Sequence, residues 1–69
     1  MIDTAKLKAT RVLRNMSREE LGRKTGLSIQ TIFRIENGMT KDPGIETITL
    51  ITKALLIDLD DILVKESIN

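Results

Sequence analysis

The sequence predicts an all-α fold, a compact arrangement of five short helices in a single domain that spans residues 1–69. Two observations lead to this prediction. Apolar residues recur at helical spacing, and residues that cap helix N-termini stand in front of most of the apolar stretches. In addition, no stretch alternates apolar and polar residues for long enough to hold a sheet together.

The first helix is expected to begin at a cap formed by Asp3 or Thr4 and to end near Asn15. Residues at helical spacing mark its apolar positions: Ala5, Ala9, Val12, Leu13 and Met16. Basic residues stand between them, so this helix is expected to be amphipathic.

The second helix is expected from about Arg18 to Thr25. Its start carries a capping box, in which Ser17 accepts a hydrogen bond from a free amide of the first turn and Glu20 reaches back to the cap.

The third helix is expected from about Ile29 to Glu36, directly after a tight turn. Gly26 can adopt the left-handed conformation that ends the second helix, and Leu27 is expected to point inward. Ser28 is placed to cap the third helix, and Asn37-Gly38 is expected to end it.

The last two helices follow a loop at residues 41–44. Apolar residues mark the fourth helix: Ile45, Ile48, Ile51 and Leu55. Asp58 is expected to cap a short fifth helix that carries Leu59, Ile62 and Leu63.

The composition argues against several classes of function. The chain has no Cys and no His, so thiolate nucleophiles, imidazole bases and the usual zinc ligands are absent, and no catalytic residue, metal site or cofactor is expected. The longest apolar run, 54–57, is far shorter than the roughly 20 residues of a membrane helix. We therefore expect a cytoplasmic protein that is not an enzyme.

Charge is distributed unevenly along the chain. Residues 1–41 hold nine Lys or Arg and four acids, a net charge of +5, whereas residues 42–69 hold two and six, a net charge of −4. The basic part can face phosphates, although both sets can also be ordinary solvated surface.

Residues 17–36 have the pattern helix, short turn with Gly, helix, which is the unit that places its second helix in the major groove of DNA. At about 100° per residue, Ile32 and Ile35 fall with Ser28 on one side of the third helix, and the other side is free. Its side chains suit base edges, because Gln30 can pair with adenine and Arg34 with guanine or phosphate. The alternative is that both are simply solvent-facing.

At these positions the chain resembles the Cro and phage-repressor helix-turn-helix family, also called the Cro/C1-type or XRE family, from about Leu7 to Leu63. The matching elements are Leu7 with Arg11, Ser17 to Leu21, Gly26-Leu27-Ser28, the segment I-F-R-I-E-N-G from Ile32 to Gly38, Pro43, Ala54-Leu55, and Asp60 to Leu63. The resemblance implies a lambda-repressor-like fold and a bacterial or phage regulator that binds double-stranded DNA.

The resemblance also implies roles for individual residues. The expected contacts with bases are made by Ser28, Ile29, Gln30, Thr31, Phe33 and Arg34. The expected contacts with phosphates are made by Arg11, Arg18, Asn37 and Lys41. Arg11 and Glu36 match a partly buried ion pair that ties the first helix to the third.

Four positions depart from the family pattern. Arg18 stands where Gln is common, and Gly22 replaces Ala at a cost of about 1 kcal/mol in helix propensity. Phe33 occupies a position that is usually small or polar, so it either packs on thymine methyl groups or folds back on the protein. Leu56 stands where Gly often follows the fourth helix, and because a left-handed Leu is strained by about 1 kcal/mol or more, the connection there is expected to differ.

The C-terminal third carries more apolar side chains than one small core obviously absorbs, and this surplus suggests a homodimer interface. The expected interface residues are Leu50, Leu56, Ile57, Val64 and Ile68, although any two of them can belong to the core. The leading interpretation is a transcriptional repressor that binds a palindromic operator as a homodimer. The alternatives are an antitoxin that binds a toxin protein and its own operator, and a protein-interaction module that binds no DNA.

Overall fold

The computed structural model describes residues 2–40 and 43–64. They form four α-helices and one 3-10 helix: α1 (Thr4–Leu13), α2 (Arg18–Thr25), α3 (Ile29–Glu36), α4 (Ile45–Leu55) and η1 (Leu59–Ile62). Within these residues the only β pairing is an isolated bridge between Ile2 and Leu63, so the predicted all-α class is confirmed. The fifth predicted helix is in fact a 3-10 turn of four residues.

Side chains cap the first three helices as predicted. The carboxylate of Asp3 accepts from the Lys6 amide, Ser17 Oγ from the Glu20 amide, and Ser28 Oγ from the Thr31 amide, each at 3.0 Å. The return bond of the capping box, from the Ser17 amide to the Glu20 side chain, is not among the hydrogen bonds of the described residues. Each helix is therefore started by a local polar contact that the sequence already contains.

The helix ends show where the backbone must turn sharply. Gly26 ends α2 at φ +78° and Gly38 follows α3 at φ +68°, as the sequence predicts. Helix α1 ends at Leu13, two residues before the predicted end, because Asn15 takes a left-handed conformation at φ +54°. The chain is thereby turned toward the cap of α2.

Leu56 ends α4 in the left-handed region, at φ 60° and ψ 41°. The expectation that this connection would differ from the usual one is therefore wrong: the turn is kept and Leu adopts it. A left-handed conformation costs a residue with a Cβ about 1–2 kcal/mol. The side chain is 79% exposed and gains little burial in return.

One hydrophobic core holds the helices together, and every helix contributes to it. The fully buried side chains are Leu7, Leu21, Ile32, Ile35, Ile48, Ile51, Leu55 and Ile62. Leu27 packs against this cluster, as predicted for the turn between α2 and α3. Burying a side chain of this size contributes about 1.5–3 kcal/mol, so these eight residues dominate the stability of the fold.

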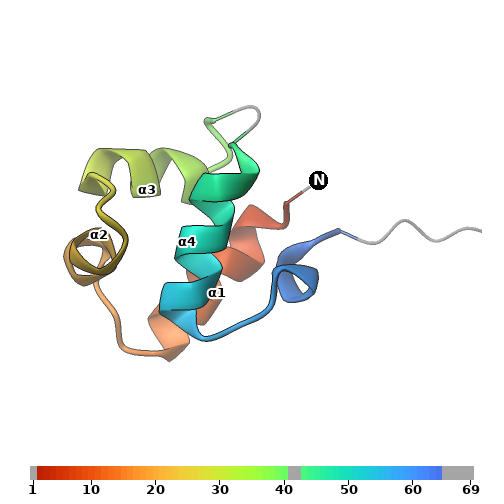
Figure 1. Ribbon diagram of the computed structural model, residues 1–69, viewed down its shortest axis with the longest axis horizontal. Coiled ribbons are helices and arrows are strands. Elements are labelled where there is room, and N and C mark those ends of the chain that lie inside the picture. The colour runs from red at the N-terminus through yellow and green to blue at the C-terminus, as the bar shows by residue number, and fades with distance from the viewer. Residues whose placement is uncertain (1, 41–42, 65–69) are drawn as a thin grey trace, which may run out of the picture.

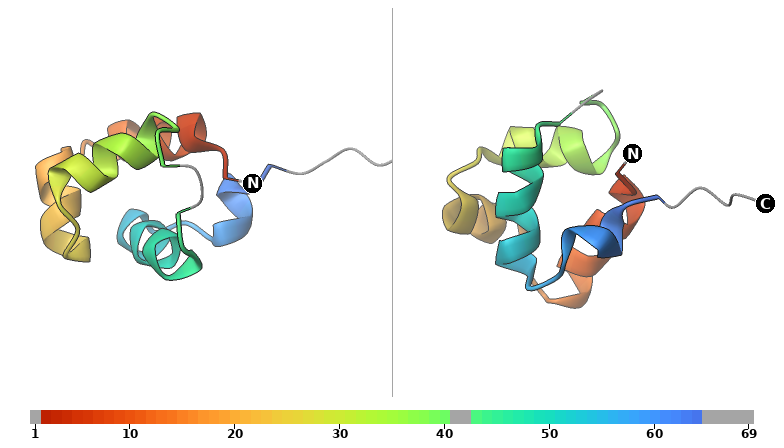
Figure 2. Two further views of the ribbon diagram at one scale, coloured as in Figure 1. Left: turned by 90° about the horizontal axis from the view of Figure 1, so that it is seen from above. Right: turned by 45° about the vertical axis from the view of Figure 1, so that its right-hand side comes forward.

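The arrangement separates two ends of the molecule. Figures 1 and 2 show α2 and the beginning of α3 at one end, η1 at the other, and α4 between them. The start of the chain lies beside η1, where the Asp3 amide donates to the Ile62 carbonyl at 2.7 Å. Helix α3 lies along one edge of the molecule, and one of its long sides is exposed. No helix in residues 2–40 and 43–64 is long and apolar enough to cross a membrane.

Gly22 lies at a close approach between α2 and the turn that follows it. A Cβ at this position would lie 2.7 Å from the Leu27 carbonyl oxygen, far inside ordinary contact distance. The sequence-based view of Gly22 as only a loss of helix propensity is therefore incomplete. Its missing side chain lets the turn pack directly on α2.

Candidate nucleic-acid interface

The turn between α2 and α3 is held by a buried threonine. Thr25 Oγ1 donates to the Leu21 carbonyl at 2.7 Å and accepts from the Leu27 amide at 3.2 Å. Leu21 and Ile32 are both fully buried, so the two helices also share the core. These contacts fix the turn on the end of α2 and pack α3 against α2. Thr25 was not predicted from the sequence, because helical spacing alone does not distinguish it from a surface residue.

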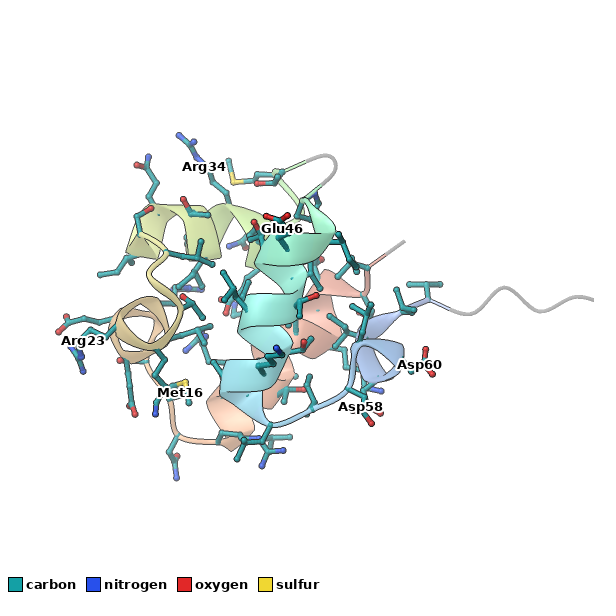
Figure 3. The ribbon with its side chains drawn as sticks, viewed as in Figure 1. Met16, Arg23, Arg34, Glu46, Asp58 and Asp60 are labelled. Atoms are coloured by element: carbon teal, nitrogen blue, oxygen red, sulfur yellow. The ribbon has the colours of Figure 1, made fainter. Side chains whose placement is uncertain are left out.

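Helix α3 has one buried side and one exposed side. Ile32, Ile35 and Glu36 are buried, while Gln30 and Arg34 are exposed. Gln30 and Arg34 are four residues apart and so neighbour each other on the helix surface. In Figure 3 the Arg34 side chain points away from the body of the protein. These two polar groups thus stand on the outermost part of the helix.

An apolar stripe runs beside these polar residues on α3. Ile29 is 49% exposed and Phe33 is 43% exposed, and they too are four residues apart. Large apolar side chains at this exposure lose favourable burial in the free protein. The exposed side of α3 therefore offers both hydrogen-bonding groups and an apolar surface to a ligand.

Behind this surface, Glu36 is paired with Arg11 of α1. Arg11 Nε donates to Glu36 Oε2 at 2.6 Å and Nη2 donates to Oε1 at 3.2 Å. Arg11 Nη1 donates to the Met16 carbonyl at 2.7 Å. Both side chains are buried, with Glu36 only 1% exposed. The bidentate geometry fixes the end of α3 relative to α1.

Arg18 of α2 makes a second ion pair with the same carboxylate. Its Nε donates to Glu36 Oε1 at 2.9 Å, and its guanidinium carbon lies 5.0 Å from the centre of the Phe33 ring. This distance is within the range of a cation–π contact. From the sequence, Arg18 was expected only at a phosphate, and neither contact was predicted. The sequence did hold one signal for these contacts, since Arg18 and Phe33 both depart from the family pattern.

These contacts form a cluster that joins α1, α2 and the C-terminal half of α3. Its members are Arg11, Arg18, Glu36 and Phe33. Two arginines surround one carboxylate, so the buried negative charge is well compensated. Within the described part of the chain, no buried side-chain nitrogen or oxygen lacks a hydrogen-bond partner. The cluster is thus a fully bonded support for the exposed side of α3.

Burial bears on the two roles expected for Arg11, the ion pair and a phosphate contact. Its side chain is 9% exposed, and Nε, Nη1 and Nη2 each already donate within the protein. The ion pair with Glu36 is therefore present, while the phosphate contact stays a prediction for which the buried Arg11 side chain leaves little surface. Arg18 keeps more freedom, because its side chain is 28% exposed and only Nε bonds to Glu36.

The remaining predicted DNA contacts lie around α3. Ser28 is exposed, and its hydroxyl donates to Thr31 Oγ1 at 2.8 Å while it caps the helix. Thr31 is half-buried, so it offers less surface to a ligand. Asn37 is exposed, and its Nδ2 donates to the Phe33 carbonyl at 2.8 Å. Lys41 lies outside the described residues.

The residues expected at a dimer interface divide by exposure. Leu50, Leu56 and Val64 are exposed, whereas Ile57 is partly buried and packs against the core. Ile68 lies outside the described residues. Three of the five residues are therefore exposed, and the interface itself stays a prediction.

The charges of the described residues differ between the two ends of the molecule. Figure 3 shows Arg34 and Arg23 around α3 and α2, and Asp58 and Asp60 around η1 at the opposite end. Arg23 donates to Glu19 at 2.9 Å, an exposed pair that is screened by salt. Among the described residues, no group of three or more His, Cys, Asp or Glu is placed to hold a metal ion.

Comparisons with known proteins agree with this geometry. The family model described as Helix-turn-helix matches residues 7–62, a range that runs from α1 to the end of η1. An uncharacterized HTH-type transcriptional regulator of Methanocaldococcus jannaschii is 39% identical over 61 residues, which are 88% of this chain and 91% of that protein. No solved structure matches the chain.

Proposed function

The chain belongs to the Cro/C1-type helix-turn-helix family of DNA-binding transcriptional regulators, and we propose that it is a repressor that binds a palindromic operator as a homodimer. In this proposal α3 lies in the major groove of each half-site. A bound dimer occludes the DNA that it covers, so repression requires no further contact with the transcription machinery.

One observation carries the proposal: Gln30 and Arg34 are both exposed and lie four residues apart on α3, and Figure 3 shows the Arg34 side chain pointing away from the protein. A Gln amide can donate to and accept from adenine, and an Arg guanidinium can donate twice to guanine. Ser28, Ile29, Thr31 and Phe33 complete the set of proposed base contacts. Of these, Thr31 contributes least because it is half-buried.

Phosphate contacts are proposed at the edges of this helix. The bond from Arg18 Nε to Glu36 leaves the two outer nitrogens of Arg18 to bind a phosphate. Asn37 is exposed at the C-terminal end of α3. Lys41 follows in the chain and supplies a further positive charge. Such contacts fix the register of the protein on the duplex but do not themselves read sequence.

The homodimer is proposed to form through the exposed apolar residues Leu50, Leu56 and Val64. Ile68 is a further candidate, whereas Ile57 contributes less because it packs against the core. Two-fold symmetry would present the two α3 helices to half-sites about 34 Å apart, one turn of DNA. An inverted repeat is therefore the expected form of the operator.

Selection from a random duplex pool at about 150 mM salt tests the proposal, followed by affinity and stoichiometry on the enriched sequence. The expected result is an inverted repeat with half-sites one turn apart, bound by two chains. Enrichment of a single half-site bound by one chain would overturn the dimer. Failure to enrich any sequence would overturn sequence-specific binding and favour a protein-interaction module.

A second function, that of an antitoxin, is favoured by the acidic surface around η1. Asp58, Asp60 and Asp61 are all exposed, and Figure 3 shows Asp58 and Asp60 far from α3. This surface suits a basic protein partner and leaves α3 accessible to an operator. Co-expression with the products of neighbouring genes tests this function. If one such product stops growth, and this chain both restores growth and co-purifies with that product, the antitoxin is supported.

A further inference from the structure

The Phe33 ring is supported from beneath by a charge that is itself fixed in place. Arg18 Nε donates to Glu36 Oε1 at 2.9 Å, and the Glu36 side chain is only 1% exposed. The Arg18 guanidinium carbon lies 5.0 Å from the ring centre. Arg18 therefore covers one part of the ring surface and limits where the ring can lie on the exposed side of α3.

The uncovered part of the ring faces outward beside the polar residues of α3. Phe33 is 43% exposed and Ile29, one helical turn earlier, is 49% exposed. Gln30 and Arg34 neighbour this apolar stripe and are suited to the hydrogen-bonding edges of bases. Within the major groove, the apolar group that stands beside those edges is the C5-methyl group of a pyrimidine.

We propose that Arg18 and Phe33 form one reading element, in which Arg18, anchored on Glu36, holds the Phe33 ring against the 5-methyl group of a pyrimidine in the operator. Phe33 is the contacting residue and Arg18 is its positioning residue. This inference rests on the proposed binding of α3 in the major groove. It adds a chemical selectivity, for methylated over unmethylated C5, that hydrogen bonds from Gln30 and Arg34 do not provide.

Two bases carry this methyl group, thymine and 5-methylcytosine, and two arms of one experiment distinguish them. The probe is the duplex enriched by selection. In one arm each thymine is replaced in turn by uracil, which lacks the 5-methyl group, and in the other each cytosine is replaced in turn by 5-methylcytosine. Burial of one methyl group is worth about 0.8 kcal/mol, which corresponds to about a fourfold change in Kd. A fourfold loss on replacing a thymine assigns thymine, and a fourfold gain on methylating a cytosine assigns 5-methylcytosine.

Three variants separate the reading element from general binding. Phe33→Ala removes the ring, and Arg18→Gln removes the guanidinium that contacts it. In both variants the ratio of Kd values for unmethylated and methylated duplex should fall from about four to near one. Arg23→Gln is the matched control, because Arg23 is also an α2 arginine but pairs only with exposed Glu19 among the described residues. Its ratio should remain near four.

The ratio is the decisive readout, because loss of a phosphate contact weakens both duplexes equally and leaves the ratio unchanged. Thermal melting and circular dichroism of each variant confirm that it is folded. If the wild-type ratio is near one at every position while the operator is still bound specifically, the reading element is overturned and the proposed function stands. If no operator is enriched, the proposed function itself fails.

Two further outcomes would overturn parts of the inference. A ratio that survives Phe33→Ala and disappears in Ile29→Ala would assign methyl recognition to Ile29. A ratio that disappears in Phe33→Ala but survives Arg18→Gln would overturn the positioning role of Arg18. In the double variant of Arg18→Gln and Phe33→Ala, the ratio should equal that of Phe33→Ala alone, because both changes act through the same ring.

Discussion

Arg11 and Glu36, 25 residues apart in the sequence, form a buried bidentate ion pair that joins the first helix of the fold to the end of α3. The pair lies directly behind the surface proposed to read DNA. Arg18 shares the same carboxylate, so one acidic side chain ties α3 to both α1 and α2. A change at Glu36 is therefore expected to reach both stability and DNA binding.

Glu36→Ala should lower the free energy of unfolding by about 3–5 kcal/mol, because it leaves the buried Arg11 charge without its partner. A chain of this size loses about 4–8 °C in Tm for each kcal/mol, so the Tm of the variant should fall by about 12–40 °C. Thermal melting followed by circular dichroism measures this. Glu19→Ala is the matched control, since Glu19 pairs only with exposed Arg23 among the described residues and should change stability by about 0.5 kcal/mol or less. Equal melting of both variants would contradict the structural role of Glu36.

Leu56→Gly should stabilise the monomer by about 1 kcal/mol, because glycine adopts the left-handed conformation without strain. Little burial is lost, since the Leu56 side chain is 79% exposed. Thermal melting at low protein concentration should show a Tm raised by about 4–8 °C. Leu56→Ala is the control: it shortens the side chain but keeps the strain, and it should show no such increase.

The same pair of variants also tests the proposed homodimer. If Leu56 lies in the dimer interface, both Leu56→Gly and Leu56→Ala should weaken association in sedimentation equilibrium. The strained turn would then be retained because the leucine side chain is used between two chains. Unchanged association in both variants would remove Leu56 from the interface.

Gly22→Ala should destabilise the fold even though alanine is the better helix former by about 1 kcal/mol. The added Cβ would lie 2.7 Å from the Leu27 carbonyl oxygen, which is backbone and moves only with the whole turn. Overpacking of this kind typically costs about 1–3 kcal/mol. Chemical denaturation measures the change, and a variant as stable as wild type or more stable would show that the turn relaxes freely.

The parts of the fold that the sequence predicted well are those set by contacts between neighbouring residues. Helices α2 and α3 lie where predicted, since each is started by a serine three residues before the amide that it binds and is followed by a glycine in the left-handed conformation. The fifth helix was predicted less well. Its four residues support only a 3-10 turn, in which the Asp61 carboxylate accepts from the Asp58 amide at 2.9 Å.

The parts that the sequence could not predict depend on which helices meet. Neither the approach of Leu27 to Gly22 nor the contact between Arg18 and Glu36 follows from spacing along the chain. The pairing of Arg11 with Glu36 was expected only from family resemblance. For the candidate site, helical periodicity identified the exposed side of α3, while the support beneath Phe33 became visible only with the neighbouring helices in place.

Arg34 and Lys41 are expected to contribute to DNA binding in different ways, and comparing their alanine variants tests the proposed interface as a whole. Arg34 is exposed on the outer side of α3, where its guanidinium can donate to guanine. Arg34→Ala should therefore weaken the free energy of binding to the selected operator by about 1–3 kcal/mol, and it should relax the preference at one base pair. Lys41 is expected to contact a phosphate, so Lys41→Ala should weaken all duplexes alike and reduce the slope of log K against log salt by about 0.9. Titrations of both variants at several salt concentrations, on the selected and a scrambled duplex, measure these effects. If Arg34→Ala binds the selected operator as tightly as wild type, Arg34 does not read a base. Of the two polar residues, Gln30 alone is then assigned to base contact.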